Sequence, residues 1–260
     1  MQNNKDYKDE NIWLMQGDCL ERMKEIPDGS VDMVLCDLPY GTTACAWDSI
    51  VPIDDLWKEY SRVIKGYGAI VLFGSQPFTT SIIASNISEF KYCWVWQKNR
   101  PTNFAHAKNK PMKKHEDICV FSKGTTVHAT QSKTRMPYYP QGLVEIEAKR
   151  VTKKANEKTD AFFADRPGHK EFTRNFTNYP HSILEFPTDQ AGLHPTAKPV
   201  DLCEYLVKTY TSAGETVLDN TMGSGSTGVA CSRSNRKFIG VERDLEYFNI
   251  AKERIMGGEG

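Results

Sequence analysis

The stretch Val217-Leu218-Asp219-Asn220-Thr221-Met222-Gly223-Ser224-Gly225-Ser226-Thr227-Gly228 combines a short apolar run, a glycine-rich turn and the start of a helix. Its glycines match the pattern G-x-G-x-x-G, which lets the backbone approach a ligand closely while the helix N-terminus attracts negative charge. The next apolar run ends at Glu242. A carboxylate at the tip of that neighbouring strand can accept hydrogen bonds from both ribose hydroxyls, so the combination predicts a nucleoside-containing cofactor.

The glycine-rich turn does not choose the cofactor by itself, because NAD, FAD and S-adenosylmethionine all bind at such turns. A Walker-type ATP loop is disfavoured, since no Lys follows the glycines. The alternative is a plain tight turn without a ligand. The apolar run before the turn and the carboxylate of Glu242 both favour the binding interpretation.

Short apolar runs elsewhere in the chain predict strands that are covered on both faces. They are Ile12–Met15, Val31–Cys36, Ala69–Phe73, Tyr92–Trp96, Ile118–Phe121, Thr216–Leu218 and Phe238–Val241. Apolar residues at helical spacing predict helices over Ile53–Ile64 and Val200–Tyr210. Strands that alternate with helices predict an α/β fold, a doubly wound and mostly parallel Rossmann-like sheet.

Residues 124–181 differ from the rest, because they are polar, rich in lysine and broken by prolines. We therefore predict that residues 1–123 and 182–260 form two halves of one domain and that residues 124–181 are an insert outside the sheet. Residues 91–180 hold 18 Lys or Arg against 8 Asp or Glu, although the whole chain holds 33 of each kind. This asymmetry favours a surface that binds phosphates, the alternative being an ordinary solvated face.

Asp37-Leu38-Pro39-Tyr40 follows directly after the predicted buried strand Val31–Cys36. In open α/β sheets, ligands bind beyond the carboxyl ends of the strands. The residue before a proline avoids the helical region, so the backbone at Leu38 is extended and can aim its carbonyl and the Asp37 carboxylate at one point. Two such acceptors would hold the N–H groups of an exocyclic amine, and Tyr40 could stack on an extruded base. Without further context, the motif could equally be a simple strand exit.

The chain resembles the DNA amino-methyltransferases of the circularly permuted beta group, over roughly residues 12–123 and 182–254. Their D-P-P-Y motif is similar to Asp37-Leu38-Pro39-Tyr40, and their F-x-G-x-G motif is similar to Met222-Gly223-Ser224-Gly225. In that group the amine-binding motif precedes the cofactor turn and the target-recognition region lies between them, which is the order found here. The segments Gln16-Gly17-Asp18-Cys19 and His194-Pro195-Thr196-Ala197-Lys198-Pro199 resemble two further family segments.

The resemblance implies direct methyl transfer from S-adenosyl-L-methionine to a base amine, with residues 124–181 as the target-recognition region. It implies a catalytic set of Asp37, Leu38, Pro39 and Tyr40. It implies a cofactor-binding set of Asp18, Lys198, Asp219, Met222, Gly223, Ser224, Gly225 and Glu242, in which Asp18 lies near the adenine, Glu242 on the ribose and Lys198 near the methionine. No metal is expected.

One position departs from the family motif, because Leu38 stands where the first proline is usual. Its main-chain carbonyl survives the change, but some backbone stiffness is lost. Asp in the first position favours adenine N6, whereas the cytosine N4 enzymes usually carry Ser there. Cytosine N4, an RNA base, a glutamine amide and a non-catalytic binding protein stay open as alternatives. Cytosine C5 methylation is disfavoured, because its thiolate typically lies in a Pro-Cys pair and none occurs here.

The expected partner is double-stranded DNA, and Lys98, Arg100, Lys110, Lys113 and Lys114 are the candidate phosphate contacts. We expect Trp94 and Trp96 to pack in the core and His115-Glu116 to be structural. A homodimer and a cognate restriction endonuclease remain open. Scattered cysteines and the lack of a signal peptide or an apolar span predict a cytoplasmic protein without a membrane partner.

Overall fold

The computed structural model describes residues 6–39, 51–127, 132–151, 172–188 and 197–257. The chain divides into two compact units, which are described separately. The first unit comprises Met1–Tyr139 and Ser182–Gly260, and the second comprises Pro140–His181. No helix among the described residues is long and apolar enough to cross a membrane.

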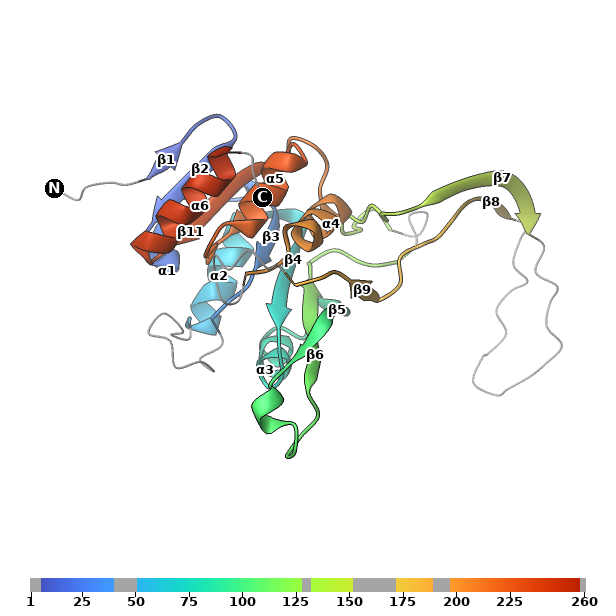
Figure 1. Cartoon of the computed structure of the whole chain (residues 1–260). Helices are drawn as coiled ribbons and strands as arrows, with labels where there is room; N and C mark the ends of the chain where they lie inside the picture. Colours follow the sequence, from blue (N-terminus) through green and yellow to red (C-terminus); the bar gives the residue numbers. More distant parts are fainter. Residues whose placement is uncertain (1–5, 40–50, 128–131, 152–171, 189–196, 258–260) are drawn as a thin grey trace. The chain divides into compact units, whose positions relative to one another are not determined.

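A nine-stranded sheet forms the centre of the first unit within the described ranges, in the order β1-β2-β11-β10-β3-β4-β6-β5-β9 (Figure 1). The strands are β1 Tyr7–Lys8, β2 Ile12–Gln16, β3 Val31–Cys36, β4 Ile64–Gly74, β5 Phe90–Thr102, β6 Lys113–Phe121, β9 Ile183–Glu185, β10 Thr216–Asp219 and β11 Lys237–Glu242. Strands β2, β11, β10, β3 and β4 are parallel, whereas β6 is antiparallel to both of its neighbours. The predicted α/β class with a mostly parallel sheet is confirmed.

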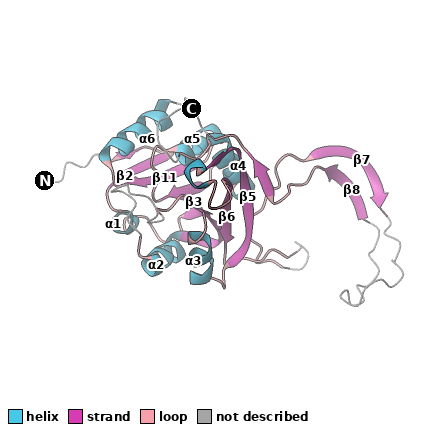
Figure 2. Cartoon of the chain, turned by 60° about the horizontal axis from the view of Figure 1, so that its bottom comes forward, coloured by secondary structure: helices cyan, strands magenta, loops and turns pink. Residues whose placement is uncertain are grey.

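Helices cover both faces of this sheet (Figure 2). One face carries α1 Cys19–Met23, α2 Ile53–Val63 and α3 Phe78–Ser85, and the other carries α4 Val200–Tyr210, α5 Ser226–Arg233 and α6 Leu245–Gly257. A short 3₁₀ turn, η1, spans Phe104–His106.

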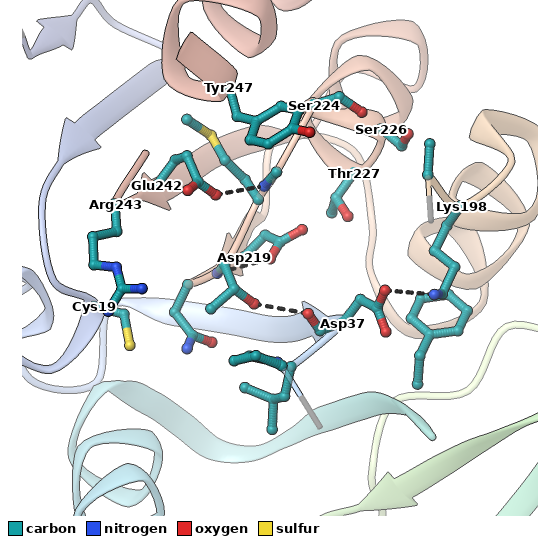
Figure 3. Close-up of a pocket in the computed structure, with 18 of the residues that line it drawn as sticks. Cys19, Asp37, Lys198, Asp219, Ser224, Ser226, Thr227, Glu242, Arg243 and Tyr247 are labelled. Atoms are coloured by element: carbon teal, nitrogen blue, oxygen red, sulfur yellow. Dashed lines mark hydrogen bonds and ion pairs between the residues drawn. The ribbon is translucent and has the colours of Figure 1, made fainter. Parts of the chain in front are cut away.

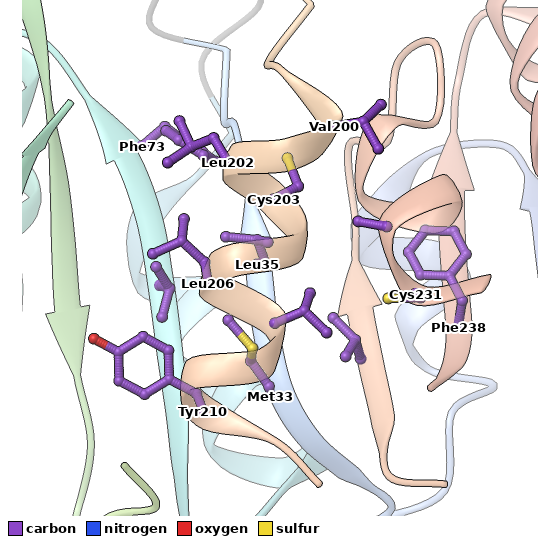
Figure 4. Packing of buried hydrophobic residues seen from close by; sticks show 14 of the residues in the cluster. Met33, Leu35, Phe73, Val200, Leu202, Cys203, Leu206, Tyr210, Cys231 and Phe238 are labelled. Carbon is purple, nitrogen blue, oxygen red and sulfur yellow. The ribbon is translucent and has the colours of Figure 1, made fainter. Parts of the chain in front are cut away.

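The central strand β3 shows why the sheet is buried on both sides. Side chains alternate across a strand, so Met33 and Leu35 face the cluster under α4, which includes Leu206 (Figure 4). Val34 and Cys36 face the other cluster, under α2. Each of these strand residues is fully buried. A continuous apolar run is therefore what a strand covered on both faces requires, and this is the pattern that the sequence shows.

All seven predicted strands are present, and β4, β5 and β6 are longer than their apolar runs. Strands β5 and β6 extend to the pair Thr102 and Lys113, beyond the point where β6 pairs with the end of β4. Beyond Gln97, where the pairing of β5 with β9 ends, they pair only with each other, and most of their side chains are exposed. Sequence periodicity cannot predict this extension, because exposed strand residues need not be apolar.

The second unit contains a separate antiparallel pair, β7 Val144–Val151 with β8 Phe172–Thr177. This strand pair was not expected from the weak periodicity of the basic region. The compact unit begins at Pro140, whereas the predicted insert begins at Gly124. The segment between them belongs to the first unit, since Met136 is buried there in the core.

The order of the parallel strands predicts an opening at the carboxyl ends of β3 and β10. From β3 the chain passes through α2 to β4 on one side, and from β10 it passes through α5 to β11 on the other. The connections after the adjacent strands β3 and β10 therefore diverge. Such a switch point, at the carboxyl ends of the strands, is where open α/β sheets bind ligands.

Candidate active site

A cavity of about 220 Å³ lies at the carboxyl ends of the central strands (Figure 3). Asp37 follows β3, Asn220 follows β10 and Glu242 ends β11, and all three line the cavity. Asp18, from the end of β2, and Lys198, just before α4, complete the wall. The topology thus brings together residues that are up to 224 positions apart in the sequence.

The glycine-rich turn and Glu242 form one end of the cavity. The Gly223 backbone N–H donates to Glu242 Oε2 at 2.9 Å (Figure 3), and the Asp244 N–H donates to Oε1 at 2.8 Å. Burial raises the pKa of Glu242, although these backbone donors oppose the shift. Two fixed main-chain groups therefore hold this carboxylate at the cavity wall.

The two glycines of the turn have different surroundings. Both have positive φ, 50° at Gly223 and 83° at Gly225, a region that side-chain-bearing residues rarely adopt. A Cβ on Gly223 would meet nothing within 4 Å, whereas one on Gly225 would lie 3.0 Å from Ala251 Cβ in α6. Gly223 thus borders the cavity, and Gly225 allows α5 and α6 to pack closely.

Asp219 lies beneath the turn and is only 4% exposed. The Thr221 N–H donates to its Oδ1 at 3.2 Å. Burial raises the pKa of Asp219 to about 7, although hydrogen bonds from Thr227 and Thr221 oppose the shift. This carboxyl is therefore partly protonated near neutral pH.

Asp37 and Lys198 form the other end of the cavity. Lys198 Nζ donates to Asp37 Oδ2 at 2.5 Å (Figure 3). Thr221 Oγ1 donates to the Asp37 carbonyl at 3.0 Å, which ties the loop after β3 to the loop after β10. Leu38 and Pro39 line the cavity as well. Cys36 is fully buried, as a small packing side chain would be, and burial raises its pKa.

Glu116 of β6 is a site residue that the sequence analysis interpreted as structural. It lines the cavity, and its Oε2 lies 3.3 Å from Lys198 Nζ. Lys98 Nζ donates to the other oxygen, Oε1, at 2.5 Å. The available signal was alternation, since Glu116 shares a strand face with the buried Ile118 and Val120, and an acidic residue on a buried face calls for a partner.

Electrostatics favour the charged forms of this group. Burial disfavours the ammonium of Lys198, but Asp37 and Glu116 outweigh it, so the pKa of Lys198 is raised. Burial likewise disfavours the Glu116 carboxylate, but Lys198 and Lys98 outweigh it and the pKa of Glu116 is lowered. The ammonium and the carboxylate both stay charged near neutral pH.

Other cofactor candidates are placed as follows. Asp18 lines the cavity and also caps α1, because its Oδ1 accepts from the backbone N–H of Leu20 at 3.0 Å. Met222 and Ser224 line the cavity too. Gly225 does not line it, and Tyr40 lies outside the described residues. Arg243 and Tyr247 also line the cavity, and sequence patterns had not singled them out.

The candidate DNA contacts fall into two groups. Arg100, Lys110 and Lys114 are exposed on the β5–β6 hairpin, where phosphates can reach them. Lys98 is instead only 11% exposed and paired with Glu116. Lys113 is half-buried beside Ser75 Oγ, and burial lowers its pKa. Among the described residues, no cluster of His, Cys, Asp or Glu could hold a metal ion.

A parallel α/β sheet with this turn, a carboxylate ending the next strand and a second carboxylate after β3 defines the Rossmann-like methyltransferase class. The family model described as "DNA methylase", which covers N6 and N4 amino-methyltransferases, matches residues 31–253. The chain belongs to this family, and the family predicted from the sequence motifs is confirmed.

Known proteins resemble the chain over most of its length. The DNA adenine methyltransferase YhdJ of Escherichia coli K12 is 26% identical over 259 residues, which cover 93% of this chain and 82% of its relative. The type II methyltransferase M2.LlaDCHI of Lactococcus lactis subsp. cremoris is 27% identical over 278 residues, covering 97% and 92%.

Solved structures share the fold at lower identity. The complex of M1.HpyAVI with SAM has a TM-score of 0.61 and 23% identity, covering 94% of this chain and 99% of the other. The cytosine-N4-specific PvuII DNA methyltransferase has a TM-score of 0.66 and 16% identity, covering 97% and 95%. Both structures thus share the fold of this chain.

Proposed function

We propose that this chain is an S-adenosyl-L-methionine-dependent DNA methyltransferase that methylates adenine N6 within a specific sequence. One observation carries the proposal. The Asp37 carboxylate, suited to an amine, and the Glu242 carboxylate, suited to a ribose, line opposite ends of one cavity. A methyl donor and a base amine could therefore meet between them.

The cavity fits the proposed cofactor. Glu242 would accept hydrogen bonds from the ribose hydroxyls, and Asp18 would lie near the adenine. Ser226 Oγ and Asn220 Nδ2 also line the cavity, and both are buried without a hydrogen-bond partner among the described residues. Buried polar groups need partners, so these atoms are suited to a polar ligand. S-adenosyl-L-methionine supplies an electrophilic methyl group on a sulfonium.

The chain's own residues would orient the amine. Asp37 and the Leu38 carbonyl accept its two hydrogens, while Tyr40 stacks on the base flipped out of the duplex. S-adenosyl-L-methionine would supply the methyl carbon, to which the amine nitrogen held by Asp37 and Leu38 would bond as the carbon–sulfur bond breaks and its electron pair stays on sulfur. The nitrogen then loses one proton, for which the Asp37 carboxylate is the neighbouring base. The catalytic effect comes from positioning and electrostatics.

Adenine is favoured over cytosine by the first residue of the motif and by the names of relatives. Asp37 stands where the resembled cytosine N4 enzymes usually carry Ser, and the relative YhdJ is named an adenine methyltransferase. Cytosine N4 is the second candidate, because the PvuII DNA methyltransferase, which shares the fold, is named cytosine-N4-specific.

Double-stranded DNA is the proposed partner. Exposed Arg100, Lys110 and Lys114 would contact phosphates and fix the position of the duplex. We assign target recognition to the basic region of residues 124–181, which includes the second unit. Relatives named as type II methyltransferases support a restriction-modification setting, in which a cognate endonuclease and a homodimer belong to the proposal.

Incubation of the wild-type protein with radiolabelled S-adenosylmethionine and unmethylated DNA of varied sequence, followed by nucleoside analysis, tests this function. N6-methyladenine is the expected product, and mapping of the modified positions gives the recognition sequence. N4-methylcytosine would establish the second candidate instead. No incorporation into any DNA would refute both.

A further inference from the structure

Glu116 occupies an unusual position for an acidic residue, in the cavity wall and only 11% exposed along its side chain. One carboxylate oxygen, Oε1, accepts from Lys98 Nζ at 2.5 Å. The other, Oε2, is buried and has no hydrogen-bond partner within the described part of the chain. Its nearest cation is Lys198 Nζ, at 3.3 Å. Glu116 thus keeps one acceptor available beside a buried ammonium.

Lys198 connects this acceptor to the amine-binding end of the cavity. Its side chain is only 8% exposed, its Nζ donates to Asp37 Oδ2, and the same atom lies 5.2 Å from the centre of the Phe73 ring. The charges of Lys98, Glu116, Lys198 and Asp37 therefore alternate along one line of contacts. Buried charges are tolerated when each has such a partner.

This arrangement creates a competition at Asp37. In the proposed reaction, Asp37 must accept a hydrogen bond from the base amine, yet Lys198 already donates to one of its oxygens. An ammonium has three donors and needs an acceptor for each when it is buried. A movement of well under 1 Å would bring Lys198 Nζ within ordinary hydrogen-bond distance of Glu116 Oε2, which lies 3.3 Å away.

We propose that Glu116 is a positioning residue for methyl transfer, which holds Lys198 beside Asp37 and takes over the lysine's hydrogen bond when a base amine binds Asp37. The inference rests on the proposed function only in assigning the amine to Asp37. It gives Lys198 a role at the acceptor end of the cavity, in addition to the contact with the methionine part that the family resemblance implies.

Glu116→Gln preserves the shape of the side chain but removes its charge, so Lys198 is left with Asp37 as its only anionic partner among the described residues. The lysine then competes with the base amine. We expect kcat to fall by about 30-fold, the size of one charge-assisted hydrogen bond, while the KM for DNA and the Kd for S-adenosylmethionine stay within about threefold. The variant Glu116→Asp keeps the charge on a shorter side chain, so its kcat should lie between those of the wild type and Glu116→Gln.

Glu185→Gln is the matched control, since Glu185 is an exposed residue of β9 in the same sheet. Its kcat should equal that of the wild type. Calorimetric binding of S-adenosylmethionine to every variant shows whether the cavity is intact, independently of transfer.

A double-mutant cycle separates positioning through Lys198 from a purely structural role. If Glu116 acts through Lys198, Glu116→Gln should have little further effect on kcat in a Lys198→Met background. The same pair should be non-additive in the urea unfolding midpoint of the cofactor-free protein, which needs no activity at all.

Three results would overturn the inference: a Glu116→Gln kcat within threefold of the wild type, the same loss of kcat with and without Lys198, or strict additivity in unfolding. The activity arms use whichever base the wild type methylates. A cytosine product would thus refute the adenine proposal alone. An inactive wild type would refute the proposed function, and the unfolding cycle would then test only whether Glu116 holds Lys198.

Discussion

The two ends of the cavity each present a carboxylate at the end of a parallel strand, but the two are held differently. Glu242 accepts from the backbone N–H groups of Gly223 and Asp244, which cannot move without the turn. Asp37 accepts from the side chain of Lys198, which has a second acceptor nearby in Glu116. A fixed carboxylate suits a cofactor that binds in one position, and an exchangeable one suits an amine that must enter and leave.

Loss of Asp37 should produce the largest effect, because it removes the proposed acceptor of the amine. We expect Asp37→Ala to lower kcat by about 10³-fold or more, with the Kd for S-adenosylmethionine within about threefold of the wild type. Single-turnover transfer and calorimetry measure the two quantities. Asp54→Ala, on the exposed start of α2, is the control. Full transfer by Asp37→Ala would show that Asp37 does not orient the amine.

Loss of Glu242 should weaken cofactor binding and leave kcat nearly unchanged, the reverse of the effect of losing Asp37. Glu242→Ala removes the proposed ribose acceptor, so the Kd for S-adenosylmethionine should rise by about 10- to 100-fold, as expected for charged hydrogen bonds. At saturating cofactor, kcat should remain within about threefold. Calorimetric titration and initial rates at high cofactor concentration check both values. An unchanged Kd would show that Glu242 has no contact with the cofactor.

The sequence predicts the Glu242 end of the cavity better than the Asp37 end. Glu242 and Gly223 were found because a glycine pattern and the end of the next strand are local features. The contact of Asp37 with Lys198 joins residues 161 positions apart, and no periodicity shows it. Glu116 was assigned a structural role because it adjoins an apolar run. The antiparallel pairing of β6, which sets Asp117 opposite Gly74 of β4 and Glu116 opposite Trp96 of β5, places it at the cavity.

The DNA contacts show the same limit. The basic stretch predicted a set of phosphate-binding cations, but the pairing of β5 with β6 turns Lys98 inward, next to Glu116, and leaves Arg100 exposed. These two residues share a strand face, but Arg100 lies further from the last pair of β5 with β9, at Gln97, and residue type alone does not show where the sheet ends. Charge composition therefore predicts a basic region but does not specify which of its cations are exposed.

Asp219 lies between the two ends and provides a pH test. Its folded-state pKa of about 7 exceeds the usual value of 3.8, so the folded protein binds the extra proton more tightly than the unfolded chain does. The stabilisation is complete below pH 3.8 and is lost as the pH rises through 7. Relative to Asp219→Asn, the wild type should lose about 2–4 kcal/mol of unfolding free energy between pH 4 and 8.

Urea denaturation of both proteins across this pH range measures the difference, with Asp54→Asn as the exposed control. Parallel pH curves for the wild type and Asp219→Asn would contradict a raised pKa at Asp219.

The exposed cations should give the smallest effect. Lys110→Gln combined with Lys114→Gln should weaken DNA binding several-fold and make the slope of log K against log salt concentration less negative by about 2, one unit for each phosphate contact. Fluorescence titrations at several salt concentrations measure this slope. Lys65 lies near the start of β4, at the amino ends of the parallel strands, so Lys65→Gln should leave the slope unchanged. An unchanged slope in the double variant would place the duplex elsewhere.

Binding of the base amine by Asp37 can be measured with two duplexes that differ in a single amino group. The duplex carries the mapped recognition sequence, with either adenine or purine, which lacks the exocyclic amine, at the target position. The wild type should bind the adenine duplex about tenfold or more tightly than the purine duplex, whereas Asp37→Ala should bind both equally. The same preference for adenine in both proteins would show that Asp37 does not bind the base amine.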